Sequence, residues 1–209
     1  MIRPALMWSH LQCSSSLSSV LSSPHSQLTK LNLNGNKLGD SGAHQLCEGL
    51  QTPNSKLKIL SLHSCDLSSE CSSSLSSILS SPHLQLTDLH LNFNKLGDSG
   101  AHQLCEGLQT PNCKLKTLSL VSCGLTSRCS SSLSSVLSSP HSQLTEMNLK
   151  DNKLGDSGAH QLCEGLRTPN CKLKTLWLFD NEISESEKKN LRSLEEELNR
   201  TGRQTYIYT

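Results

Sequence analysis

The stretch LTDLHLNFNKLGDSGAHQLCEGLQTPNCK, residues 86–114, decides the fold because the chain repeats it with small changes. The other units begin at Leu28, Leu57, Leu115, Leu144 and Leu173. The repeat is 29 residues long, and the prolines confirm it: Pro24, Pro53, Pro82, Pro111, Pro140 and Pro169 recur at that spacing. A fixed period of this size is typical of a repeat architecture, in which each unit contacts only its neighbours along one axis.

Every full unit opens with the pattern L-x-x-L-x-L-x-x-N/C-x-L, as in Leu86, Leu89, Leu91, Asn94 and Leu96. Leucines two positions apart place one face of a short strand inward. The Asn or Cys then falls at a turn, where its side chain is expected to satisfy backbone groups that the strand leaves open. Because this residue recurs in every unit, we predict a ladder of side-chain hydrogen bonds that connects the turns of successive units.

The units that begin at Leu28, Leu86 and Leu144 have Asn at the turn and are here called the Asn-type units. The second half of each is predicted to be a helix. Ala101, Leu104 and Leu108 recur at the spacing of one helical face. Either Asp98 or Ser99 is expected to be the N-cap, because both residue types accept hydrogen bonds from the first free N–H groups.

The sister units, with Cys at the turn, carry a serine run that alone resembles a linker. Cys71, Leu75, Ile78 and Leu79 nevertheless recur at helical spacing. The pattern predicts a helix with apolar residues on one face and serines on the other. Serine is a mediocre helix former, so these helices should depend on stacking more than on propensity.

Three parts are predicted: a partial N-terminal repeat over 1–27, five full repeats over 28–172, and a C-terminal repeat with capping helix and tail over 173–209. Ser184 and Glu187 form a capping-box pattern that opens the last helix. Gly202 is expected to end that helix. The tail after it is predicted to add one short strand.

The array begins on a helix with no strand before it. Terminal repeats need a polar cap for solubility. One hypothesis is that the chain is a fragment, or the tail of a longer protein. The alternative is that Leu6, Met7, Trp8 and Leu11 cover the N-terminal end of the core and act as a cap.

The unit resembles the ribonuclease-inhibitor type of leucine-rich repeat, in which Asn and Cys alternate at the turn. The alternation runs Asn36, Cys65, Asn94, Cys123, Asn152, Asn181. Repeats such as NKLGDSGAHQLCEGLQTPNCKL, with the ending EKKNLRSLEEELNRTGR, are most similar to C-terminal arrays of NOD-like receptors, the NACHT/LRR family in its fish-type expansion. The resemblance implies an α/β leucine-rich repeat solenoid, a horseshoe with parallel strands on the concave face and helices on the convex face. It also implies ligand sensing, or restraint of the receptor's own activation.

The three Asn-type units can be compared with one another. Residues 37–50 of the first unit are identical to residues 95–108 and 153–166 of the other two. The identity includes helix positions predicted to be exposed, where random drift should also have left changes. The units differ at strand and turn positions predicted to face the concave side, which indicates a recognition surface on a fixed scaffold. These positions are Lys30, Asn32, Asn34, Asp88, His90, Asn92, Phe93, Glu146, Asn148, Lys150 and Asp151. Recent duplication followed by drift is the alternative.

In the last unit the same positions hold Thr175, Trp177, Phe179 and Asp180. Trp is a preferred anchor in protein interfaces. The two aromatic residues are therefore candidate partner contacts. The alternative is that they pack under the C-terminal tail, against Tyr206 and Tyr208.

Charge and composition limit the classes of partner. The net charge is +1, which gives no clustered basic face for nucleic acid. No apolar run approaches the ~20 residues that span a bilayer. The ten cysteines occupy repeated slots and are expected to be buried, reduced thiols, which favours a cytoplasmic location.

No pattern indicates catalysis, a metal or a cofactor. The pair His102-x-x-Cys105 and its copies supply too few ligands for a structural zinc site, which needs four. No serine lies in a G-x-S-x-G elbow, and no G-x-x-x-x-G-K-[ST] phosphate loop occurs. Most histidines occupy positions that recur in several units, which indicates a structural role in the repeat and not a catalytic one.

The leading prediction is a non-enzymatic protein-interaction or ligand-sensing module of a NOD-like innate immune receptor, or a truncated paralogue. Its partner would be a protein ligand or another domain of the same receptor. The alternative is a free-standing ribonuclease-inhibitor-like protein that binds an enzyme on its concave face. That role favours an acidic face, whereas Lys30, Asp88, Glu146 and Lys150 have mixed signs.

Overall fold

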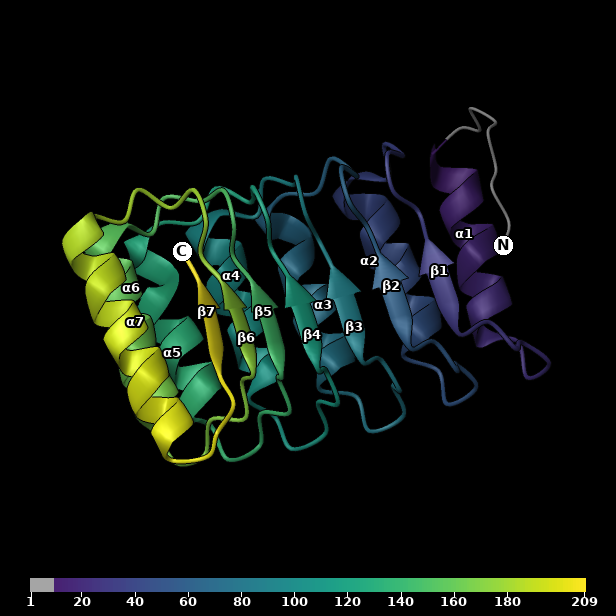
Figure 1. Ribbon diagram of the computed structural model, residues 1–209. Coiled ribbons are helices and arrows are strands. Elements are labelled where there is room, and N and C mark those ends of the chain that lie inside the picture. The colour runs from purple at the N-terminus through teal and green to yellow at the C-terminus, as the bar shows by residue number, and fades with distance from the viewer. Residues whose placement is uncertain (1–9) are drawn as a thin grey trace.

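The computed structural model describes residues 10–209, with side chains from residue 16 onward. In this part, seven short parallel strands form one sheet in chain order. All the helices lie against one face of that sheet (Figure 1). The strands are β1 Lys30–Asn32, β2 Ile59–Ser61, β3 Asp88–His90, β4 Thr117–Ser119, β5 Glu146–Asn148, β6 Thr175–Trp177 and β7 Tyr206–Tyr208. The predicted solenoid is confirmed.

One helix follows each of β1 to β6, and another precedes β1. The helices are α1 His10–Ser22, α2 Gly39–Leu50, α3 Ser72–Leu79, α4 Gly97–Leu108, α5 Ser130–Ser138, α6 Gly155–Arg167 and α7 Glu185–Arg200. Short 3₁₀ turns, Ser69–Cys71 and Ser127–Cys129, lead into α3 and α5. None of the helices described is both long enough and apolar enough to cross a bilayer.

The core is a row of side chains that runs along the sheet. The middle residues of the strands pair in register, and all of them are buried. They are Leu31, Leu60, Leu89, Leu118, Met147, Leu176 and Ile207. Burial of such apolar side chains is the main stabilising contribution to an array of this kind.

The turn ladder predicted from the Asn and Cys alternation is present. The Asn94 side-chain oxygen accepts the backbone N–H groups of Cys65 at 3.0 Å and Leu67 at 3.1 Å. Its side-chain nitrogen donates to the carbonyls of Leu62 at 2.7 Å and Leu91 at 2.8 Å. One buried side chain thus ties two successive turns together.

The helices pack most closely where an Asn-type helix follows a serine-rich one. A Cβ added at Gly107 on α4 would lie 2.5 Å from the carbonyl oxygen of Ser76 on α3. Gly165 meets Ser134 in the same way. Ser72 is fully buried beside Gly100. The prediction that the serines lie away from the packed face was therefore wrong for these positions, because they fill the seam between helices.

The predicted N-caps were also wrong. Helix α4 begins at Gly97, before Asp98 and Ser99, and its N-cap residue makes no side-chain cap hydrogen bond. The Asp98 carboxylate instead reaches the next unit, where it accepts the backbone N–H of Thr126 at 2.7 Å and its hydroxyl at 2.6 Å. Asp40 and Asp156 make the same pair of bonds to the following unit.

The C-terminal end forms as predicted, with one difference. The Ser184 hydroxyl accepts the Glu187 N–H at 3.2 Å, but Glu187 does not return the bond because Asp156 already accepts the Ser184 N–H. Gly202 ends α7 with φ +87°, and β7 pairs with β6. At the other end, the residues proposed as an N-terminal cap, Leu6, Met7 and Trp8, lie outside the described residues, as does the side chain of Leu11.

Candidate functional site

The register stacks the divergent residues into two columns on the sheet face opposite the helices. The first column is Lys30, Ile59, Asp88, Thr117, Glu146, Thr175 and Tyr206. The second is Asn32, Ser61, His90, Ser119, Asn148, Trp177 and Tyr208. Because both columns alternate with the buried core row, their side chains point away from the helices.

Several of the candidate asparagines bind the scaffold itself. The Asn92 side-chain oxygen accepts the Ser119 hydroxyl at 2.7 Å and the Val121 N–H at 3.0 Å. Asn34 makes the equivalent bonds to the next unit. Asn32 and Asn148 accept backbone N–H groups two residues further along their own chains. The oxygens of Asn34 and Asn92 therefore bridge neighbouring units, while those of Asn32 and Asn148 fix the turn of their own unit. Comparison of the units alone does not show these roles.

Charges on this face are mixed in sign. Lys30 and Glu146 are exposed and Asp88 is half-buried, in the first column. Lys150 lies 3.7 Å from Asp180 across neighbouring turns, with both side chains largely in solvent. Asp151 accepts a hydrogen bond from the Ser122 hydroxyl.

The turn after β3 carries an exposed aromatic residue in an unusual conformation. Phe93 has φ +57° and is 51% exposed, and its ring lies 4.7 Å from that of His63. Gly35 takes the equivalent position in the first unit with φ +72°. The equivalent residues Ser64, Ser122, Asp151 and Asp180 also have positive φ, so the turn of every unit sets this conformation. Phe93 differs in being bulky, and a bulky residue in the left-handed region is destabilising.

Four aromatic residues form a cluster at the C-terminal end of the face, here called the aromatic patch: Trp177, Phe179, Tyr206 and Tyr208. The Tyr208 ring lies 6.0 Å from Trp177, with 13° between the planes, and 6.2 Å from Phe179. Phe179 and Tyr208 remain 39% and 42% exposed. The tail thus contacts both predicted aromatic residues, but as the next strand beside them, and it adds Tyr206 and Tyr208 to the exposed surface.

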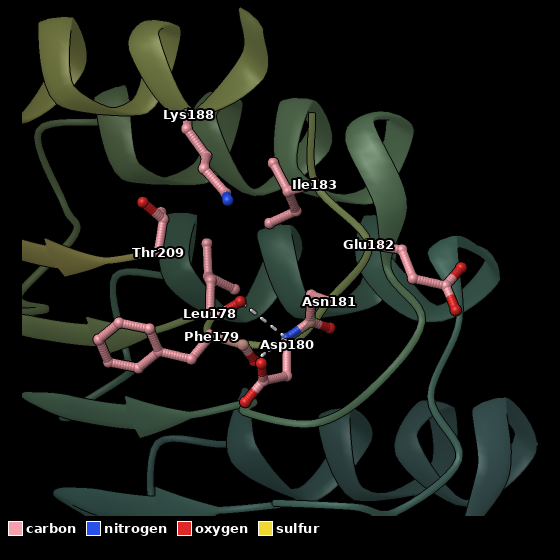
Figure 2. Close-up of a pocket in the computed structure, with 8 residues that line it drawn as sticks. All are labelled: Leu178, Phe179, Asp180, Asn181, Glu182, Ile183, Lys188 and Thr209. Carbon is pink, nitrogen blue, oxygen red and sulfur yellow. Dashed lines mark hydrogen bonds between the residues drawn. The ribbon is translucent and has the colours of Figure 1, made fainter. Parts of the chain in front are cut away.

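A pocket of about 320 Å³ lies next to the aromatic patch, past the end of β6 (Figure 2). Phe179 is one of the lining residues, and the Lys188 ammonium group points from α7 toward Leu178 and Ile183. Lys188 is also 2.8 Å from Glu185. The remaining lining residues are Leu178, Asp180, Asn181, Glu182, Ile183 and Thr209. The lining is therefore mixed: Leu178, Phe179 and Ile183 are apolar, Lys188 is a cation, and Asp180 and Glu182 are acids.

The paired histidines and cysteines do not converge on a reactive centre. His102 is exposed and lies 2.6 Å from the Ser132 hydroxyl, whereas Cys105 is buried in the core. Burial raises the pKa of the Cys105 thiol to about 12, with the nearby Glu106 adding to the shift, so the thiol stays protonated at neutral pH. Within the described residues, no three metal-binding side chains come together.

The geometry defines the class of protein. Parallel strands on one face, helices on the other and a turn ladder between them are the features of a leucine-rich-repeat solenoid. Three segments, 26–47, 84–105 and 142–163, match the family model described as a leucine-rich repeat. They cover the strand and most of the helix of the three Asn-type units. No curated protein matches the chain.

Two solved structures share this fold. A leucine-rich-repeat protein of Leptospira interrogans is 23% identical with a TM-score of 0.51, over 87% of this chain and 37% of that protein. The tropomodulin C-terminal domain of Caenorhabditis elegans is 16% identical with a TM-score of 0.56, over 90% of this chain and 98% of the domain. The chain therefore spans 37% of the length of the Leptospira protein.

Proposed function

We propose that the chain is a non-catalytic protein-binding module that takes its partner on the concave strand face, at the aromatic patch. The observation that carries this proposal is a group of stacked rings on the face where the units differ most, in which half-buried Trp177 lies beside exposed Phe179 and Tyr208. Aromatic anchors of this kind dominate protein interfaces. The convex helices, by contrast, are identical among the three Asn-type units over Lys37–Leu50 and its copies.

We infer further that the module serves a NOD-like receptor or a truncated paralogue in the cytoplasm. The support is the resemblance of the repeats, with their alternating Asn and Cys turns. Nine buried, unpaired thiols among the described residues fit a reducing compartment. The partner would be a protein ligand or another domain of the same receptor. A ribonuclease-type inhibitor is less favoured, because Lys30 and Lys150 interrupt the acidic residues of the face.

The first step of the test identifies a partner. A photo-cross-linking residue is placed at Asn148 on the strand face, and in a matched variant at Ser73, which is exposed on α3. A protein captured from position 148 and absent from position 73 is then purified. Capture from both positions at equal yield would argue against binding on the strand face.

The second step measures affinity for that purified partner. Trp177→Ala is expected to weaken binding about 30-fold, since loss of such an anchor costs about 2 kcal/mol. Tyr206→Ser tests a patch residue that makes no ring contact, so its effect on folding is small. If both variants bind as the wild type does, the aromatic patch is not the site.

A further inference from the structure

One edge of the solenoid, the lower edge in Figure 1, is formed by the loops that lead from each helix into the next strand. The motif Lys-Leu-Lys occurs three times in these loops. Its leucines, Leu57, Leu115 and Leu173, are buried, whereas all its lysines are exposed. These lysines are here called the lysine row: Lys56, Lys58, Lys114, Lys116, Lys172 and Lys174.

Hydrogen bonds between units keep the lysine row in register. The Thr87 N–H donates to the Lys58 carbonyl at 2.8 Å, and the Lys116 N–H donates to the Thr87 carbonyl at 2.7 Å. The same bonds continue through Thr145 to Lys174. Because neighbouring strands lie ~4.8 Å apart, successive Lys-Leu-Lys motifs are about 10 Å apart along the edge. Threonine or glutamine takes the equivalent positions between them, and no acid does.

The charges of the lysine row are not neutralised by the chain itself. Within the residues whose side chains the structure describes, none of these lysines forms an ion pair. Lys56 donates instead to the neutral Gln27 side chain at 3.1 Å. The adjoining acid Asp88 accepts the Thr87 hydroxyl at 2.6 Å. The row is therefore free to attract an anionic group of a partner.

The opposite edge, formed by the turns after the strands, differs because it carries both signs. Lys153 lies 3.9 Å from Glu182, and Lys150 lies 3.7 Å from Asp180. The net charge of +1 therefore conceals an uneven distribution, since the acids lie mainly on this opposite edge and on the helices. Only the folded arrangement brings the lysines together on one edge.

The lysine row adjoins the aromatic patch, and this continuity favours a protein as its occupant. Lys174 directly precedes β6, and the Tyr206 N–H of the patch donates to the Lys174 carbonyl at 2.8 Å. No acid follows Lys174 on the neighbouring strand, whereas Asp88 and Glu146 take that place beside Lys58 and Lys116. The most positive end of the row therefore meets the surface proposed to bind a protein.

Nucleic acid and membrane are less favoured by the chemistry of this edge. Arginine suits phosphate because its planar group donates two parallel hydrogen bonds, but the row consists of lysines. Arg203, which precedes β7, already donates to three backbone carbonyls. Stable attachment to a membrane surface also needs apolar side chains that enter it, and the leucines of the motif are buried.

We propose that the partner carries an acidic segment that lies along the lysine row beside the aromatic patch, with Asp or Glu side chains paired to the lysines. The proposal rests on the proposed function and adds a second contact surface to it. Exposed ion pairs are individually weak and are screened by salt. Affinity should therefore come from several pairs together and should fall as ionic strength rises.

The test titrates a fluorescein-labelled dodecapeptide of alternating Glu and Ser against the full chain by anisotropy at low salt. The row variant combines Lys58→Gln, Lys116→Gln and Lys174→Gln. The control variant combines Lys37→Gln, Lys95→Gln and Lys153→Gln, which removes the same charge from exposed lysines of the opposite edge. The row variant is expected to bind about tenfold more weakly, and the control within about twofold of the wild type.

Three results would overturn the proposal. Equal weakening in the two variants would show a general response to net charge. Tighter binding of a single-stranded uridine dodecamer than of the peptide, lost in the row variant, would show that the row binds nucleic acid. Tighter binding of phosphatidylserine vesicles, lost in the same variant, would show that it binds a membrane. Melting temperatures equal to the wild type confirm that both variants are folded.

The two proposals fail in different ways. If the peptide does not distinguish the row variant from the control while the cross-linked partner still requires Trp177, the acidic segment is wrong and concave-face binding stands. If the peptide requires the lysine row but the partner is indifferent to Trp177, the aromatic patch is wrong and the row is a separate site.

Discussion

The convex seam between helices and the concave strand face differ in how they are built. In the seam, backbone meets backbone, as where Gly107 lies against Ser76, and a single added carbon would collide. On the strand face, residues such as Asp88 and Glu146 occupy one column with room around them. The seam therefore tolerates little change, while the face tolerates much.

This difference separates stability from recognition within each unit. Buried ladder and seam contacts supply the cooperativity between neighbouring units. Column residues that make no hydrogen bond to the scaffold contribute little to folding and can vary, whereas Asn32, Asn148 and Ser119 do make such bonds. Mutations can test this separation, because scaffold positions should change the free energy of unfolding and face positions should change binding.

The largest expected effect is at the turn ladder. Asn94→Ala removes five hydrogen bonds and leaves buried backbone groups of two units unpaired. Each buried unsatisfied group costs about 1–3 kcal/mol, so a loss of about 4 kcal/mol is expected in denaturant unfolding. Asn36→Ala is the matched control, because Asn36 is exposed and bonds only within its own turn. Equal losses would show that the ladder between units does not stabilise the array.

The helix seam is expected to come next. Gly107→Ala places a Cβ against the backbone of Ser76 and should cost about 2–3 kcal/mol through overpacking. Gly100→Ala meets a side-chain hydroxyl, that of Ser72, at 2.8 Å, and should cost less because the neighbour is not backbone. Thermal unfolding of the two variants measures the difference, and a harmless Gly107→Ala would argue against close backbone packing.

The bonds between Asp98 and Thr126 should make the array sensitive to acid. Burial pushes the pKa of Asp98 up, but hydrogen bonds from the Thr126 hydroxyl and N–H outweigh it and hold the pKa below its ordinary value of 3.8. A depressed pKa gives stability that is complete above the unfolded value and is lost as pH falls through the folded value. The contribution should therefore disappear below about pH 4.

Asp98→Ala measures that contribution. The variant is expected to lose about 1 kcal/mol at pH 7, because charge-assisted bonds at a partly exposed site are worth little more. Its stability should also fall less steeply than that of the wild type between pH 5 and pH 3. A wild-type curve that is flat in this range would contradict the assignment.

The smallest effect on folding, and of opposite sign, is expected on the strand face. Phe93→Gly relieves a left-handed residue and should stabilise the chain by about 0.5–1 kcal/mol, measured by denaturant unfolding. The same substitution should weaken binding. Asp66→Gly, at another exposed residue with positive φ, controls for the gain from glycine alone and should leave binding unchanged.

Much of the fold could be predicted from periodicity, because strand, turn and helix each have a local pattern. Contacts between units could not be, since they depend on which side chain the next unit brings into register. Asp98 is a reasonable N-cap by local rules, yet it bonds to Thr126 instead. Gly100 and Gly107, seven residues apart on one helix, were a signal of close packing that the pattern analysis missed.

The candidate site was predicted in part. The alternation of apolar residues correctly placed Trp177 on the open face of the sheet. The sequence could not show that the Asn92 side chain is hydrogen-bonded rather than free to bind a partner, because its hydrogen bonds are to the neighbouring unit. Packing of Trp177 and Phe179 against Tyr206 and Tyr208 was one of two alternatives, and Tyr208 does contact both rings, but the tail does so as the predicted strand and extends the face. The division into 1–27, 28–172 and 173–209 stays a prediction.

The seam also restricts how such a gene can lengthen or shorten. Gly107 and Gly165 lie on Asn-type helices and need a serine-rich helix immediately before them. Unequal crossing-over that inserted or removed one unit would place two helices of the same type next to each other. The glycine of an Asn-type helix would then no longer pack against a serine-rich helix. Exchange of two units at a time preserves every junction. We therefore expect alleles of this locus to differ in length by even numbers of units.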